Sequence, residues 1–545
     1  MTPRLTFHGA SRAVTGSCFR LDTAGGTVLV DCGMFQGSKT EKALNYRPFP
    51  FDAGKVDAVL LTHAHIDHSG LLPKLFRDGF KGPIHATPAT VDLCHVMLPD
   101  SAHIQESEVE MLNRRNRRRG GQDIEPIYDS RHAEATLALF RPQEMDAWFP
   151  VLPGFRARFW NAGHLLGSAS VEVELSAPNP ALRLLFSGDI GPDSKLLQPD
   201  PQSPSGLDYL ICESTYGDVD RIEASAEKRR ATLRDEVKAA WRDDGVLLIP
   251  TFAVERAQEL IVDLTTLMMA GEIPFCPVHV DSPMASRATA IFRKHAKELE
   301  NGPALLDGLR THHLHFTETV EQSRALANAR GFHIILAASG MCEAGRIRHH
   351  LRNWISRDAA SLLLVGYQAE ATLGRLLLDG ARNVRIQGEE FPVRARIRSI
   401  DLYSGHADGP ELVEWIRERQ PVRHATFLVH GEEEAMAGLA ARLQGLVLQE
   451  KMVIPALDDS YDLTPDGHIR RAGTEPPRLA PEQVARLDWH NDVSRLILDI
   501  NEALRSVADE KARQSTIRRL RRALEEGGHL PPPVTVQGTG IRAGH

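Results

Sequence analysis

Four potential metal ligands within six residues constrain the fold and chemistry of this chain more than any other feature. They directly follow Val56–Thr62, an apolar and β-branched run typical of a buried strand, and they are His63, His65, Asp67 and His68. Zinc favours imidazole nitrogen and carboxylate oxygen, and a loop after a strand can turn alternate side chains toward one point. One histidine here would as easily be a surface or core residue, but the four side chains together predict a metal site.

Two further candidates stand alone in later glycine-containing turns. His164 lies in NAGHLLGSAS, where small residues permit close approach, and Asp189 lies in LLFSGDIGP, between glycines after a predicted strand. A lone aspartate in such a turn is usually a turn former. The order HxHxDH, then His, then Asp favours metal binding for both residues.

The pattern changes between about residues 220 and 388, where strand, loop and helix repeat. Gly245–Pro250 precedes a helical run at Glu255–Met269, and the same pairing recurs for Val278–Asp281 with Ala285–Glu298, His333–Ala337 with Gly345–Asn353, and Ser361–Val365 with Ala371–Leu378. Such alternation is typical of a parallel sheet with helices on its faces. Residues 394–454 return to short strands that end in histidines, which predicts one domain interrupted by a second.

Length and composition are those of an ordinary globular protein with two domains and an extension: 545 residues, 42% hydrophobic and 25% charged. No run approaches the roughly 20 apolar residues that span a bilayer. Met1–Arg20 has no charged start followed by an apolar stretch, so we expect no membrane association and a cytoplasmic location. The six scattered cysteines predict buried thiols. The net charge of −8 neither indicates nor excludes nucleic acid, since a local basic groove can hold RNA.

The ligand order resembles that of the metallo-β-lactamase superfamily, over residues 1–215 and again over about 390–455. The resemblance implies an α/β fold, an αββα sandwich that holds two zinc ions per chain. It places the first ion on His63, His65 and His164, the second on Asp67 and His68, and Asp189 between the two. Asp31, in VLVDCG, matches an aspartate that lies behind the metals and orders the site.

Three later motifs are similar to the additional motifs of the β-CASP group, whose members process nucleic acids. They are Glu213 in ICESTYGD, His406 in DLYSGHADG and His430 in FLVHGEEEA. The segments PTFAVERAQEL, DSPMA, LAASGMCEAGR and GYQAEATLGR also resemble the inserted domain of this group, with Ala371 where we expect glycine. The implied order is a first part at 1–215, a β-CASP α/β domain at 216–393, a return at 394–455, and a partly helical extension at 456–545 with a disordered tail.

The resemblance implies a zinc-dependent ribonuclease that cuts RNA phosphodiester bonds by a two-metal mechanism and leaves 5′-phosphate and 3′-hydroxyl ends. His430 would complete the shell of the second metal, and it favours RNA because RNA-specific members carry histidine there. His406 would protonate the leaving 3′ oxygen, since an imidazole titrates near neutrality. Glu213 would hold His406 in place, and Asp67 and Asp31 would complete the catalytic set.

The substrate contacts are less well defined by the sequence. The loop at Ser339 and Gly340 could offer backbone N–H groups to a phosphate, with Arg346 adding charge. The basic run Asn113–Arg119 could follow a single-stranded RNA backbone or be a solvated face, and the basic C-terminal helix could contact RNA or form a homodimer. A DNA nuclease, a small-ester hydrolase on the same metal core, and a non-catalytic RNA-binding protein are the alternatives.

Overall fold

The computed structural model describes residues 2–37, 39–118, 121–176, 179–193, 195–221, 225–368, 372–467, 470–472, 478, 500, 504 and 509–526. The chain divides into one unit at Met1–Asp488 and a second at Trp489–His545. Helix α17 (Glu510–Glu526) belongs to the second unit, and its role in RNA contact or dimerisation stays a prediction. Ala371, the first of the two helices predicted between 483 and 526, and the tail from Pro531 lie outside the described residues.

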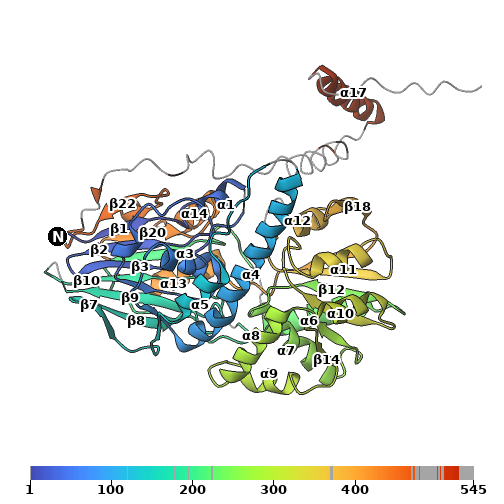
Figure 1. Ribbon diagram of the computed structural model, residues 1–545, viewed down its shortest axis with the longest axis horizontal. Helices are drawn as coiled ribbons and strands as arrows, with labels where there is room; N and C mark the ends of the chain where they lie inside the picture. Colours follow the sequence, from blue (N-terminus) through green and yellow to red (C-terminus); the bar gives the residue numbers. More distant parts are fainter. Residues whose placement is uncertain are drawn as a thin grey trace, which may run out of the picture. The chain divides into compact units, whose positions relative to one another are not determined.

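Two sheets, built from both ends of the first unit's sequence, form its sandwich (Figure 1). The eight-stranded sheet has the order β23 (Arg470–Arg471), β22 (Ser460–Asp462), β1 (Arg4–Phe7), β2 (Phe19–Thr23), β3 (Gly26–Val30), β4 (Ala58–Leu60), β5 (Ile84–Ala86) and β6 (Phe140–Pro142). The seven-stranded sheet has the order β21 (Met452–Val453), β20 (Ala425–Val429), β11 (Tyr209–Glu213), β10 (Leu182–Phe186), β9 (Ala169–Leu175), β8 (Phe155–Asn161) and β7 (Phe149–Leu152).

The core between these sheets is built from alternate residues of each strand, because successive side chains of a strand point to opposite faces. Phe7 of the first sheet packs on Phe427 of the second with ring centroids 5.1 Å apart, and Phe19 stacks on Phe186 at 5.9 Å. The intervening positions of the same strands face outward onto helices, as Leu29 between the core residues Val28 and Val30 does.

Helices cover both outer faces and complete the predicted αββα sandwich. On the first sheet lie α2 (Ile66–Ser69), α3 (Leu72–Arg77), α4 (Pro88–Arg118) and α5 (Ser130–Leu137), and on the second lie α13 (Gly409–Glu418) and α14 (Glu433–Arg442). The short α1 (Lys39–Leu44) packs through Leu44 on Phe35. Leu412, Trp415 and Leu439 seal the second outer face against Leu210 and Leu428. All six cysteines are free and buried, as predicted.

The inserted domain has the parallel sheet that the sequence predicts. Its order is β14 (Leu314–Phe316), β13 (Val278–Val280), β15 (His333–Ala337), β12 (Val246–Pro250), β16 (Ala360–Val365) and β19 (Arg396–Ile400). Its helices are α6 (Ala226–Ala240), α7 (Arg256–Met269), α8 (Pro283–Lys294), α9 (Gly302–Gly308), α10 (Val320–Ala325), α11 (Ile347–Trp354) and α12 (Leu373–Leu378), with a hairpin of β17 (Asn383–Ile386) and β18 (Glu389–Pro392). Helices α6 and α7 pack on one face of the sheet and α11 and α12 on the other.

Two strands lie past the domain boundaries that the sequence predicts. β19 begins after residue 393 yet pairs with β16, and β22 begins after residue 455 yet pairs with β1. β19 carries no apolar run, because it is an edge strand whose Arg396 and Arg398 bond to Glu236 of α6. β22 has three residues, too few to show a periodicity.

The inserted domain joins the sandwich through α8 and α4, which contact each other (Figure 1). Asp92 of α4 accepts hydrogen bonds from Lys294 and His295 at 2.6 Å each, and Asp100 accepts one from Arg287 at 2.6 Å. These charged contacts fix one side of the inserted domain against the sandwich. Within the described residues, none of the helices has the length and apolar character needed to cross a membrane.

Three histidines on one face of the inserted sheet predict an acid-sensitive fold. His279 stacks on His315 at 5.2 Å and lies 6.0 Å from His333. Burial and then these two neighbours lower the pKa of His279 to about 4. In the unfolded chain, His279 is protonated below about pH 6.5, whereas in the folded protein it stays neutral down to about pH 4. The folded state is therefore fully stable with respect to His279 above about pH 6.5, and it loses stability as the pH falls toward about 4.

We therefore expect the melting temperature of His279→Asn to fall less than that of the wild type between about pH 7.5 and about pH 5. Thermal unfolding of both proteins across this range measures the difference, and any loss of metal at low pH is common to both. A variant whose melting temperature falls as steeply as that of the wild type would contradict the assignment.

Candidate metal centre

The predicted ligands converge at the ends of strands from both sheets. His63 lies three residues after the end of β4, and His65 precedes α2, which carries Asp67 and His68. His164 lies in the loop between β8 and β9. Asp189, Glu213 and His430 lie at the carboxyl ends of β10, β11 and β20, three neighbouring parallel strands.

Local backbone geometry makes this convergence possible. Gly33 lies against the Asp67 loop, where a Cβ would lie 1.5 Å from the Asp67 carbonyl oxygen, so only glycine fits. His430 has a φ of +50°, a conformation uncommon outside glycine, and its N–H donates to Ala10 O at 2.7 Å. These close approaches hold loops from distant parts of the chain around one point.

The first ligand group consists of three imidazoles and one carboxylate. His65 Nδ1 lies 3.2 Å from both His63 Nε2 and His164 Nε2. Asp189 Oδ2 lies 3.4 Å from His63 Nε2 and 3.5 Å from His164 Nε2. These separations fit a tetrahedral ion with Zn–N bonds of about 2.0–2.1 Å.

The second ligand group lies on the other side of Asp189. His68 Nε2 is 3.1 Å from His430 Nε2 and 3.2 Å from Asp189 Oδ1, and His430 Nε2 is 3.8 Å from Asp67 Oδ2. Asp189 therefore presents one carboxylate oxygen to each group. Its Oδ1 is buried and has no hydrogen-bond partner among the described residues, which fits a carboxylate that binds a cation.

Burial sets the protonation of the first group in favour of metal binding. It lowers the pKa of His65 to about 3, and it also lowers the pKa of His63 and of His164. Neutral imidazoles keep a lone pair for a metal. In the second group burial opposes the charged form of His68, but Asp189 and Asp31 outweigh it and raise its pKa. Metal binding there would release a proton.

Asp31 contacts the second ligand group from behind. Its Oδ2 accepts from His68 Nδ1 at 2.7 Å and from the Thr62 hydroxyl at 2.9 Å, and its Oδ1 accepts from the Thr62 N–H at 2.8 Å. The first group is held similarly, since His164 Nδ1 donates to Gly405 O at 2.6 Å. These contacts fix which ring nitrogen faces each metal position.

His406 and Glu213 form a pair at the edge of the ligand groups. The buried Glu213 accepts from His406 Nδ1 at 3.1 Å with Oε1, which also accepts from the Ile190 N–H at 2.6 Å. The other nitrogen, His406 Nε2, lies 3.9 Å from Asp189 Oδ2. Glu213 thus orients His406 so that Nε2 faces the site, where it can exchange a proton with a bound substrate.

The predicted phosphate contacts Ser339, Gly340 and Arg346 lie in the inserted domain. Arg346 donates to Asp281 at 2.6 Å, to Thr317 O at 3.0 Å and to Glu318 O at 2.8 Å, so its guanidinium is bound within the domain. The Ser339 hydroxyl accepts from the Ala344 N–H at 3.1 Å. These contacts favour structural roles for both residues, and their binding to phosphate stays a prediction.

The basic run at the end of α4 is also engaged in ion pairs. Arg114 pairs with Glu110, and Arg117 donates to Asp123 at 3.0 Å. Both arginines are exposed. Their neutralisation by nearby carboxylates favours a solvated face over an RNA contact.

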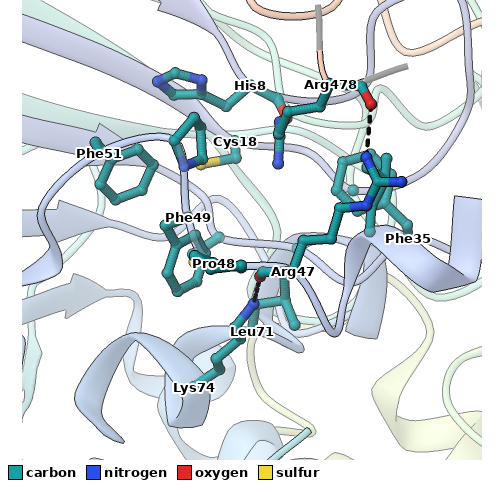
Figure 2. Close-up of a pocket in the computed structure, with 15 residues that line it drawn as sticks. His8, Cys18, Phe35, Arg47, Pro48, Phe49, Phe51, Leu71, Lys74 and Arg478 are labelled. Atoms are coloured by element: carbon teal, nitrogen blue, oxygen red, sulfur yellow. Dashed lines mark hydrogen bonds between the residues drawn. The ribbon is translucent and has the colours of Figure 1, made fainter. Parts of the chain in front are cut away.

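A separate pocket lies beside the Cys32–Gly33 segment (Figure 2). Its cavity of about 10 Å³ has room for one water molecule, so it is too small for a nucleotide. Arg478 spans its rim, where Arg47 donates to Arg478 O at 2.7 Å and Arg478 Nε donates to Asp458 at 2.9 Å. The pocket is therefore a packing site for Arg478.

A carboxylate from the inserted domain holds the His164 loop, a contact that the sequence analysis did not predict. Glu255 is buried, has a φ of +69° and accepts from the Leu166 N–H at 3.1 Å. Lys195 lies 3.6 Å from Glu255 and donates to His164 O. Glu255 belongs to the segment PTFAVERAQEL, which resembles the inserted domain, but this contact was not predicted because a buried glutamate at a helix start has the same sequence pattern as an exposed one.

We expect Glu255→Ala to weaken zinc binding by the first ligand group about 10- to 100-fold, since residues that support ligands have effects of this size. Competition with a chromophoric chelator measures the affinity. Asp263→Asn, which removes another buried α7 carboxylate, is the control and should lose stability without weakening zinc binding. Equal zinc affinity in Glu255→Ala and the wild type would rule out this support.

Three family models match successive parts of the chain. The metallo-beta-lactamase superfamily matches residues 12–234, the Beta-Casp domain residues 257–377, and the Zn-dependent metallo-hydrolase RNA specificity domain residues 390–455. The last of these contains His406 and His430.

Curated relatives match most of the chain. Ribonuclease TTHA0252 of Thermus thermophilus is 39% identical over 450 residues, which cover 81% of this chain and 96% of that protein. Transcription termination factor FttA of Methanosarcina mazei is 30% identical, over 80% of this chain and 68% of that protein. FttA of Pyrococcus abyssi is 31% identical, over 81% and 68%. The chain therefore belongs to the β-CASP family of the metallo-β-lactamase superfamily and is a metal-dependent hydrolase.

Proposed function

We propose that this protein is a zinc-dependent ribonuclease that hydrolyses RNA phosphodiester bonds at two zinc ions. One observation carries the proposal: Asp189 directs one oxygen to each of two ligand groups, with His406 Nε2 beside it. The first ion would bind to His63, His65, His164 and Asp189, and the second to Asp67, His68, His430 and Asp189.

The residues around the ions suit phosphodiester hydrolysis. Two bound zinc ions would lower the pKa of a shared water and neutralise charge on the phosphate oxygens. As an imidazolium, His406 would donate Nδ1–H to Glu213 and direct Nε2–H toward the site, so it could deliver the Nε2 proton to the leaving 3′ oxygen. The products would then carry 5′-phosphate and 3′-hydroxyl ends.

RNA is the substrate class that the comparisons favour. The relative with 39% identity is named a ribonuclease, and the domain matched at 390–455 is described by RNA specificity. His430 lies within that domain and faces the second ligand group. DNA and small esters could be cut by the same metal core, so both belong among the test substrates.

Replacing His406 separates proton transfer from metal binding. We expect zinc-loaded His406→Ala to retain two zinc ions per chain and to cleave a 5′-labelled single-stranded RNA about 10²- to 10⁴-fold more slowly, the usual range for a lost general acid. Elemental analysis and gel-resolved cleavage give the two readouts. His424→Ala, which lies outside the ligand groups, is the matched control. Loss of zinc from His406→Ala would mean that the residue supports the metals instead.

Replacing Asp67 tests the second ion. Asp67→Ala removes one carboxylate ligand, so we expect one zinc per chain and a loss of cleavage in the same variant. The readouts are zinc content and cleavage of the same RNA. Full activity in this variant would contradict the two-metal proposal, and wild-type cleavage of DNA or an ester without cleavage of RNA would contradict the substrate class.

A further inference from the structure

Two exposed aromatic side chains lie at the ends of adjacent strands of the inserted sheet. Phe252 is 42% exposed and follows β12, and Tyr367 is 39% exposed and follows β16. The two strands pair in parallel, with Leu248 opposite Leu362. Their carboxyl ends, and therefore the two aromatic residues, lie at the same edge of the sheet, where parallel α/β sheets bind ligands.

The loop at Gly340 links the two aromatic residues. Gly340 lies against Phe252, where an added Cβ would be 3.0 Å from the ring, so the absence of a side chain at Gly340 lets the ring lie close to the loop. Gln368, the neighbour of Tyr367, donates to Gly340 O and to Gly366 O at 3.1 Å each. We call the surface of Phe252, Gly340 and Tyr367 the aromatic ledge.

The aromatic ledge connects to the proposed general acid through Tyr216. Tyr367 makes an edge contact with Tyr216 at 6.0 Å between ring centroids, and Tyr216 makes another with His406 at 6.0 Å. Arg221 holds Tyr216 from a further side, with its guanidinium carbon 4.0 Å from the ring centroid. The ledge is therefore two ring contacts from His406, within reach of nucleotides next to the bond that is cut.

We propose that the aromatic ledge is a base-stacking subsite that receives unpaired nucleotides beside the cleaved phosphate. The proposal rests on the ribonuclease function above. Exposed aromatic rings bind bases of any sequence through their π faces, and only an unpaired strand can offer its bases to such a surface. The ledge would thus select single-stranded RNA without selecting its sequence.

Phe275 provides a matched control for the test. It is 58% exposed, it stacks on His313 at 4.9 Å, and it precedes β13 at the opposite end of the same sheet.

We expect zinc-loaded Phe252→Ala and Tyr367→Ala to raise KM for a single-stranded RNA about 5- to 150-fold with little change in kcat, as the loss of one stacked base predicts. Phe275→Ala should match the wild type, and Phe252→Trp and Tyr367→Phe should restore tight binding.

A second substrate separates stacking from other contacts. An RNA with abasic nucleotides near the cleavage position should bind wild type and the two alanine variants equally weakly. Unchanged KM in both alanine variants, or equal losses for Phe275→Ala, would overturn the inference.

Binding of fluorescent RNA to zinc-loaded His406→Ala, with and without Phe252→Ala, distinguishes the subsite proposal from the ribonuclease proposal. If wild type cuts no RNA but the ledge variant still binds it less well, the ribonuclease proposal fails and the subsite stands. If neither protein binds RNA, the ledge assignment fails as well.

Discussion

The structure of the site depends on the Asp189 carboxylate, whose two oxygens serve two ligand groups at once. Its position follows from topology: β10, β11 and β20 are parallel neighbours, so Asp189, Glu213 and His430 leave the second sheet side by side. The first sheet brings the HxHxDH loop to the same point from β4. A buried carboxylate oxygen that lacks a hydrogen bond is costly unless a cation satisfies it, so metal binding explains the two ligand groups better than packing does.

The inserted domain contributes residues to the candidate metal centre. Glu255 holds the backbone after His164, and the chain that leaves β19 brings Gly405 to His164 Nδ1 and His406 to Glu213. The aromatic ledge extends the same edge of the inserted sheet toward His406 through Tyr216. In the proposed function, ligand orientation, proton transfer and substrate contact would all depend on residues that the insertion positions, which would adapt the metal core to a polymeric substrate.

The sequence was sufficient to predict the site where ligands cluster, and the fold where the hydrophobic periodicity is strong. The spacing of His63, His65, Asp67 and His68 predicts a metal site directly, and the strand–helix alternation predicts the parallel sheet. It was insufficient where a residue acts through a distant contact. β19 and β22 carry too little apolar pattern to be recognised as strands. Arg346 is bound by Asp281, which lies 65 positions away in the chain. Glu255 resembles any glutamate at a helix start, and only the structure shows its φ of +69° and its contact with Leu166.

The most direct measurement of the two-metal centre is a crystal structure of the zinc-loaded protein with anomalous scattering data collected on both sides of the zinc absorption edge. The account predicts two anomalous peaks, one beside Asp189 Oδ2 among His63, His65 and His164, and one beside Oδ1 among Asp67, His68 and His430. A single peak, or zinc bound away from Asp189, would contradict it.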